Sequence, residues 1–107
     1  MTTPLTADEL LLLLRRRWGV SYDLQLVQRR GRLYLQVMWA YLEQQSFPLS
    51  PAEYGARLEQ LAAALNDLGA AEPVRQWLLT TAEKPRLGRA VGLALELSGE
   101  RLREFLL

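Results

Sequence analysis

The chain has 107 residues, of which 50% are hydrophobic and 23% are charged, a composition typical of one folded domain with its own core. Thirteen basic residues against twelve acidic residues leave a formal net charge of +1, so no overall field draws the chain to nucleic acid or to an anionic membrane. Cysteine and histidine are absent, which excludes disulfides, thiol nucleophiles, iron–sulfur clusters and histidine-based metal sites or catalysis. We therefore expect a single domain over residues 1–107.

The first element predicted in chain order is a helix that begins after Thr6. Thr6 and Glu9 have the spacing of a capping box, and Gly19 is a typical helix stop, so the helix should end near Trp18. The preceding residues, 1–5, are expected to form a loose end. The longest apolar run in this region is too short to span a membrane, and acidic residues precede it where a signal peptide would have basic ones. We therefore expect a cytoplasmic protein without a membrane span.

Residues 22–41 predict a two-stranded antiparallel hairpin. Apolar and polar residues alternate along both halves, so that Leu35 and Val37, for example, share one face. Gly31, in the basic stretch between the halves, can adopt the positive φ that a tight hairpin connection needs. A hairpin alone is marginal in water, so helices are expected to cover its apolar face. The stretch 38–42 is apolar on both faces, which predicts either helices on both sides of the sheet there or a partner site.

A second capping box begins the next helix. Ser50 and Glu53 have its spacing, with proline at the first helical position, and the helix should end before Gly69. A shorter helix is expected from about Pro73, and residues 84–88 are expected to form a loop.

The last part of the chain predicts a strand and a further helix. Residues 90–97 alternate between large apolar residues and small or polar ones, as in a strand, although alanine and leucine keep a helix as an alternative. Gly92 within this stretch indicates a bulge or a close backbone approach. Ser98 can cap a final helix over 99–106. The order α-β-β-α-α-β-α predicts an α+β domain, with a small three-stranded antiparallel sheet packed with about four helices.

Few residues could carry catalysis. Two of the serines, Ser50 and Ser98, are expected helix caps, and no histidine is available as a base for the others. The acidic residues stand at helix starts or are scattered, and they show neither a catalytic carboxylate pair nor the spacing of an oxygen-ligand loop for a metal. A glycine-rich phosphate loop is absent as well. The sequence therefore predicts that the protein is not an enzyme and has no metal or cofactor.

The basic residues fall mainly in three clusters. Arg29, Arg30 and Arg32 form the tip of the expected hairpin and are candidate anion-binding residues. If the clusters at 15–17 and 84–89 converge on this tip, the shared surface would suit an acidic protein, RNA or lipid headgroups. If they do not converge, they are solvated charges at the ends of elements. Nucleic acid is the weaker expectation, because single-stranded binders use stacking aromatics and the exposed face of the hairpin offers only one.

Three segments carry a resemblance to a known family. They read WGVSYDLQL at 18–26, LQVMWAYLEQQSFPL at 35–49 and PRLGRAV at 85–91. In these segments, and in a Glu-Tyr pair at 53–54, the chain resembles a small family from cyanobacteria and plastids that is known only as a domain of unknown function. The family usually has lysine at the position of Arg89. The resemblance extends over most of the chain, from about residue 10 to residue 105.

The resemblance implies a role in oxygenic photosynthesis, such as the assembly or regulation of a thylakoid complex. Genes of the family often lie beside genes for cytochrome b6f subunits and for a component of the twin-arginine translocase. Biogenesis of the Rieske protein or of cytochrome b6f is therefore the most specific form of this expectation.

Together these observations predict a non-enzymatic binding or assembly factor with a protein partner, located in the cytoplasm or at the periphery of the thylakoid membrane. The expected contact surface is the hairpin with the loop at 85–91. Its candidate partner-binding residues, which packing does not obviously require, are Gln36, Glu43, Gln44, Arg86 and Arg89. The alternative is a nucleic-acid or anionic-ligand binding module that uses the arginine clusters.

Overall fold

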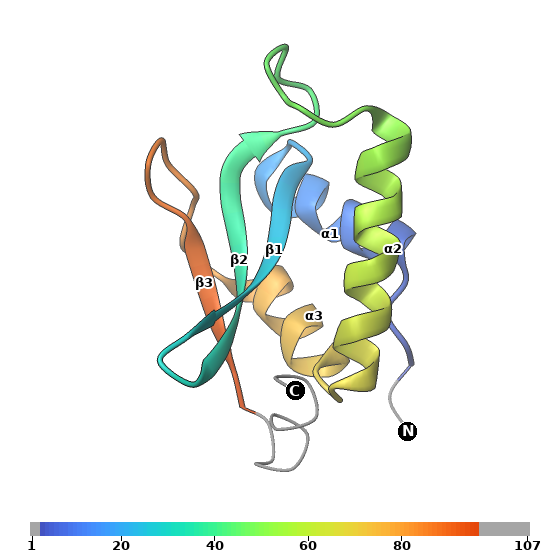
Figure 1. Cartoon of the computed structure of the whole chain (residues 1–107), viewed down its shortest axis with the longest axis vertical. Helices are drawn as coiled ribbons and strands as arrows, with labels where there is room; N and C mark the ends of the chain where they lie inside the picture. Colours follow the sequence, from blue (N-terminus) through green and yellow to red (C-terminus); the bar gives the residue numbers. More distant parts are fainter. Residues whose placement is uncertain (1–2, 97–107) are drawn as a thin grey trace.

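The computed structural model describes residues 3–96, which form an α+β domain with a three-stranded antiparallel sheet (Figure 1). Its elements in chain order are α1 (Ala7–Trp18), β1 (Tyr22–Arg29), β2 (Arg32–Tyr41), α2 (Pro51–Asp67), α3 (Ala71–Thr80) and β3 (Val91–Leu95). The sheet order is β1-β2-β3, so β2 is central. The predicted fold class is confirmed, with three helices in the described residues where about four were expected. The expected helix over 99–106 and its cap Ser98 lie outside those residues.

One hydrophobic core joins the three helices to a single face of the sheet. Leu24, Leu35 and Val37 of the sheet are fully buried, as are Leu10 of α1 and Leu65 of α2. In Figure 1 the three helices lie together on one side of the sheet. The described residues therefore do not support helices on both sides of the stretch 38–42, whose side chains are all half-buried.

The helix ends are set by local sequence, as predicted. The Thr6 hydroxyl oxygen accepts a hydrogen bond from the Glu9 N–H, and Gly19 ends α1 with a φ of 81°. The Ser50 and Glu53 side chains each bond the other's backbone N–H, which completes the capping box of α2. Each of these devices satisfies polar groups that the helix itself leaves unpaired.

Leu5 belongs to the core rather than to a loose end. Its side chain is only 3% exposed, and its backbone N–H and C=O are both hydrogen-bonded by the Asn66 side chain, at 2.8 and 2.9 Å. The expectation of a loose end was thus wrong for Leu5, because the partner that holds it lies 61 residues further along the chain.

The hairpin turn consists of two residues, Arg30 and Gly31, both with positive φ (54° and 75°). This backbone matches the right-handed twist of the two strands, and Gly31 adopts it without steric cost. The predicted hairpin is confirmed.

The stretch expected at 90–97 contains a strand, β3, which pairs regularly with β2 from Val91 opposite Val37 to Leu95 opposite Leu33. Gly92 lies in this regular register, and a Cβ built there would be 3.7 Å from Gln36 Cγ, an ordinary contact. The expected bulge or close backbone approach at Gly92 was therefore wrong.

Candidate functional site

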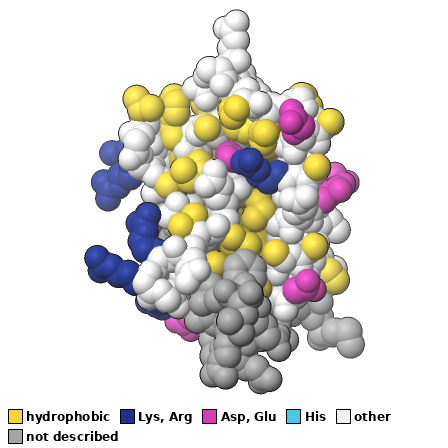
Figure 2. All heavy atoms as spheres, in the orientation of Figure 1, with side chains coloured by type: hydrophobic (Ala, Val, Ile, Leu, Met, Phe, Trp, Pro, Cys, Tyr) yellow, Lys and Arg dark blue, Asp and Glu magenta, His cyan; other side chains and the backbone are white. Residues whose placement is uncertain are grey.

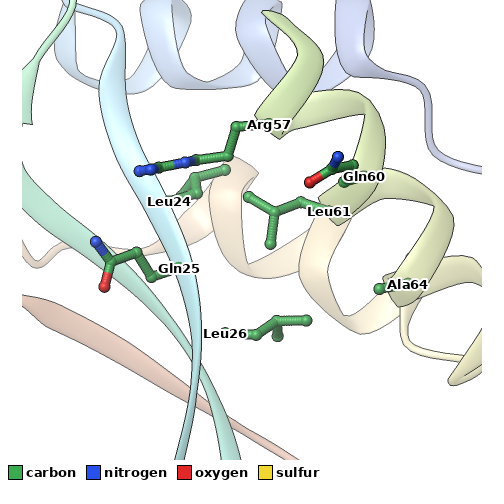
Figure 3. Close-up of a pocket in the computed structure, with 7 residues that line it drawn as sticks. All are labelled: Leu24, Gln25, Leu26, Arg57, Gln60, Leu61 and Ala64. Carbon is green, nitrogen blue, oxygen red and sulfur yellow. The ribbon is translucent and has the colours of Figure 1, made fainter. Parts of the chain in front are cut away.

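A groove of about 420 Å³ lies between β1 and α2 (Figure 3). We call it the β1–α2 groove, and it is lined by Leu24, Gln25, Leu26, Arg57, Gln60, Leu61 and Ala64. Leucine and alanine side chains form its floor, and two amides and one guanidinium stand around it. Its volume falls in the range of binding sites for small molecules.

The spacing of residues on α2 explains one wall of the groove. Arg57 lies three and four residues before Gln60 and Leu61, and Ala64 lies four and three residues after them, so the four share one face of the helix. The other wall is β1, which is an edge strand of the sheet. Ala64 is short, so α2 does not fill the space beside the strand at that point.

Two polar contacts close the end of the groove where β1 begins. The Tyr54 hydroxyl donates a hydrogen bond of 2.8 Å to the Tyr22 carbonyl, and burial raises the pKa of Tyr54 well above its ordinary value. The Arg57 Nη1 atom lies 2.8 and 2.7 Å from the two carboxylate oxygens of Asp23. The Asp23 side chain is only 8% exposed and the Arg57 side chain is 37% exposed, so the anion is buried and the cation reaches solvent.

Figure 2 shows how charge is distributed on the face that carries the groove. Hydrophobic side chains run down the middle, most of the basic side chains lie on the side of the sheet, and most of the acidic ones lie on the side of α2.

A second, more polar pocket of about 270 Å³ lies before β3, and its lining includes Lys84, Arg86 and Arg89. Arg86 and Arg89 flank a two-residue turn and exchange backbone hydrogen bonds of 3.0 and 2.8 Å. Leu87 within the turn is 79% exposed, and Gly88 has the positive φ of 75° that the turn requires. We call residues 86–89 the basic turn.

The basic clusters do not converge on one surface. The hairpin tip with Arg29, Arg30 and Arg32 lies next to the pair Leu33–Leu95, whereas the basic turn precedes Val91 at the other end of β3. At about 3.3 Å per residue along β2, roughly 20 Å separate the two clusters. The third cluster is partly used in packing: within it, Arg17 donates hydrogen bonds to carbonyls at the end of α3.

The predicted partner-binding residues are dispersed. Arg86 and Arg89 are together in the basic turn, whereas Gln36 lies on the sheet face opposite the helices, beside Gly92. Gln44 is half-buried in the turn after β2, where its N–H donates to the Tyr41 carbonyl.

Glu43 has a structural contact that explains its presence. Its two carboxylate oxygens accept hydrogen bonds of 2.8 Å from the N–H and the hydroxyl of Ser21, a fully buried residue, and Arg15 lies 3.7 Å away. Burial opposes ionisation of Glu43, but the hydrogen bonds from Ser21 and the charge of Arg15 together lower its pKa below the ordinary value of 4.5. The hydrogen bonds of Glu43 therefore hold the segment just after β2 against the residue just before β1.

We expect Glu43→Ala to lower the free energy of unfolding by about 1–2 kcal/mol, because two donors of Ser21 lose their acceptor. Since the folded-state pKa of Glu43 is lowered, its contribution is present above pH 4.5 and is lost as the pH falls. Urea unfolding at pH 7 and pH 3 measures both effects. Gln44→Ala is the control and should change stability by less than about 0.5 kcal/mol; an equal loss in the two variants would contradict the assignment.

Two further properties hold for residues 3–96. No group of three or more acidic residues is placed so as to hold a metal ion. None of the helices there is both long and apolar enough to cross a membrane.

The comparison with protein families identifies the chain. A model for a domain of unknown function, DUF3067, matches residues 8–106. The chain belongs to the DUF3067 family. The resemblance to a small cyanobacterial family, seen first in three sequence segments, is thus confirmed. No curated protein matches the chain.

A solved structure supports the fold of this DUF3067 domain. The solution NMR structure of Alr2454 from the cyanobacterium Nostoc sp. strain PCC 7120 is similar, with a TM-score of 0.85 and 46% sequence identity. The similarity covers 96% of this chain and 98% of that chain.

Sequence reasoning missed the β1–α2 groove. Arg57, Gln60 and Ala64 were not among the predicted site residues, because the sequence does not show that their face of the helix lies beside a strand. The signal that could have found the groove is this polar and small stripe on a helix, combined with a hairpin whose first strand has only one partner.

Proposed function

We propose that this DUF3067 protein is a non-enzymatic binding factor that recognises another protein and assists the assembly of a photosynthetic complex. The observation that carries the proposal is the basic turn, where the exposed Leu87 stands between Arg86 and Arg89. An apolar side chain beside two cations on a protruding turn suits an acidic protein partner with an apolar contact.

The geometry of the basic turn favours binding. The backbone hydrogen bonds between Arg86 and Arg89 fix its conformation, so little conformational freedom is lost when a partner docks. Neither arginine has a side-chain hydrogen bond or ion pair within residues 3–96, which leaves both guanidinium groups available. Lys84 adds a third cation to the adjoining pocket, against one carboxylate of Glu83.

The photosynthetic part of the proposal rests on the family. Alr2454 comes from a cyanobacterium, and the family resemblance implies a lineage of oxygenic phototrophs. The protein would then act in the cytoplasm or at the periphery of the thylakoid membrane, with cytochrome b6f or its Rieske protein as the leading candidate complex.

The test is affinity purification of the tagged protein from mildly solubilised cyanobacterial cells, followed by mass spectrometry. We expect subunits of a photosynthetic complex to be recovered, and the double variant Arg86→Glu with Arg89→Glu to lose them at least tenfold through charge reversal. Arg16→Glu, a charge reversal at an exposed position of α1, is the control and should retain them. Unchanged recovery and unchanged complex levels in the first variant would show that the basic turn is not the contact surface.

An anionic-ligand binding module is the second candidate, because Lys84, Arg86 and Arg89 line one pocket. Affinity for single-stranded RNA, measured against salt concentration, separates the two candidates. Contacts that neutralise phosphates must weaken steeply as salt rises, and an absent or flat response eliminates the RNA form of this function.

A further inference from the structure

We propose that the β1–α2 groove binds an extended, acidic segment of another protein, which adds to the free edge of β1 as a fourth strand of the sheet. This surface is separate from the basic turn, so the inference goes beyond the function proposed above.

The register of the hairpin determines which backbone groups of β1 face the groove. Arg29 and Arg32 flank the two-residue turn, so they form a hydrogen-bonded pair between β1 and β2. Hydrogen-bonded and non-hydrogen-bonded pairs alternate along an antiparallel ladder. The N–H and C=O groups of Leu24, Leu26 and Gln28 therefore point away from β2, toward the free edge.

A contact from α2 independently locates this edge. The register shifts between Tyr22 and Leu24, but beyond the shift the Leu42 N–H donates to the Ser21 carbonyl, so Tyr22 and Tyr41 form a non-hydrogen-bonded pair. The Tyr22 carbonyl therefore also lies on the free edge, and the Tyr54 hydroxyl of α2 donates to it. Helix α2 thus runs along the free edge of β1. Within residues 3–96, the Tyr54 hydroxyl is the one group outside the sheet that bonds the backbone of β1. The edge beyond Tyr22 is a row of backbone donors and acceptors, which another extended chain complements.

The groove supplies the second feature that an added strand needs. Alternate side chains of a strand point to the same face, so those of the added segment would enter the groove over Leu26, Leu61 and Ala64. The remaining side chains would lie on the other face of the sheet, level with Gln25. An apolar groove between an edge strand and a helix is a recurrent way in which domains bind extended peptides.

The charges around β1 favour an acidic occupant. Arg57 stands at one end of the groove, with only its Nη1 atom engaged by Asp23 among the described residues. The three arginines of the hairpin tip stand at the other end of β1. Along β1 these four arginines outnumber the one carboxylate of that strand, Asp23, whereas most other acidic side chains on this face lie on the side of α2 (Figure 2). Acidic side chains at the ends of the added strand would complement this excess of positive charge.

The experiment begins with a phage-displayed library of random ten-residue peptides, selected on the full chain. We expect enrichment of peptides in which apolar residues alternate and acidic residues flank them. The best peptide, made synthetically, should slow amide hydrogen exchange of Leu26 and Gln28 by about tenfold or more, because their N–H groups become paired. The amides of Gln25 and Val27, which already pair with β2, serve as internal controls.

Two tryptophan variants test the position of the peptide. Ala64→Trp fills the groove and should weaken binding at least tenfold, whereas Ala63→Trp, on the exposed neighbouring position, should not. Amide spectra of β2 and β3 verify that both variants are folded. Methylating the peptide nitrogens that face β1 should abolish binding, and methylating the alternate nitrogens should not.

Three outcomes would overturn the proposal: no enriched peptide, binding that leaves the exchange of Leu26 and Gln28 unchanged, or a dimer whose β1 edge is already protected by a second copy. The double variant Arg86→Glu with Arg89→Glu should bind the peptide normally. The experiments therefore test peptide binding in the groove separately from partner binding at the basic turn.

Discussion

Replacing Arg57 by alanine is expected to lower the free energy of unfolding by about 2–4 kcal/mol, a large effect for a side chain on the outward side of a helix. The reason is the carboxylate that is left behind. Asp23 is buried and both of its oxygens bond Arg57, so the variant keeps a buried anion without its cation, with only a long hydrogen bond of 3.4 Å from the Gln25 amide left among the described residues. We place the effect at the low end of the range for buried ion pairs because Arg57 itself is 37% exposed and partly screened by water.

The double-mutant cycle with Asp23→Ala tests this reason directly. Asp23→Ala removes the buried charge and leaves Arg57 free to turn toward solvent, so it should cost less than Arg57→Ala. The double variant should be more stable than Arg57→Ala alone, since the unpaired anion is gone. Urea unfolding measures all three, with Gln60→Ala as the control on the same helix face. An Arg57→Ala loss below about 0.5 kcal/mol would show that the ion pair contributes no net stability.

The parts of the fold that follow from neighbouring residues could be predicted from the sequence. The helix caps at Thr6 and Ser50, the helix stop at Gly19 and the turn at Gly31 each depend on interactions within a few residues. The strand over 91–95 could also be predicted from its alternation, although its composition allowed a helix. The segment is a strand because it pairs with β2, and this pairing turns the apolar residues of both strands toward the same core.

The candidate sites could be predicted less well, because they depend on contacts between distant residues. Glu43 was expected to be free for a partner, yet it binds Ser21, which lies 22 residues earlier. The polar stripe of α2 forms a wall of a groove only when β1 is placed beside it. Local patterns identify which residues point outward, but they do not identify what those residues face.

Arg75→Ala is expected to lower the free energy of unfolding by about 2–3 kcal/mol, because Arg75 joins three separate segments. Its Nε and Nη2 atoms donate to both carboxylate oxygens of Glu9 in α1, at 2.6 and 2.9 Å. It also donates to Glu72 in its own helix and to the Thr3 carbonyl at the start of the described chain. The Arg75 side chain is 15% exposed and that of Glu9 is 30% exposed, so water screens this pair less than an ordinary surface ion pair. Arg75→Lys should recover only part of the loss, since lysine cannot bond both oxygens in a fixed plane.

The dependence on pH separates this network from simple loss of packing. The hydrogen bonds from Arg75 are the main reason that the pKa of Glu9 lies below its ordinary value of 4.5. The stability that Glu9 contributes is therefore fully present above pH 4.5 and is lost as the pH falls through the lowered pKa. The difference between the wild type and Arg75→Ala should consequently be smaller at pH 3 than at pH 7, as measured by urea unfolding. The exposed Arg16, replaced by alanine, provides the control and should change stability by less than about 0.5 kcal/mol at either pH. A difference of the same size at both pH values would mean that Arg75 stabilises the chain by the contacts of its aliphatic portion rather than by its charge.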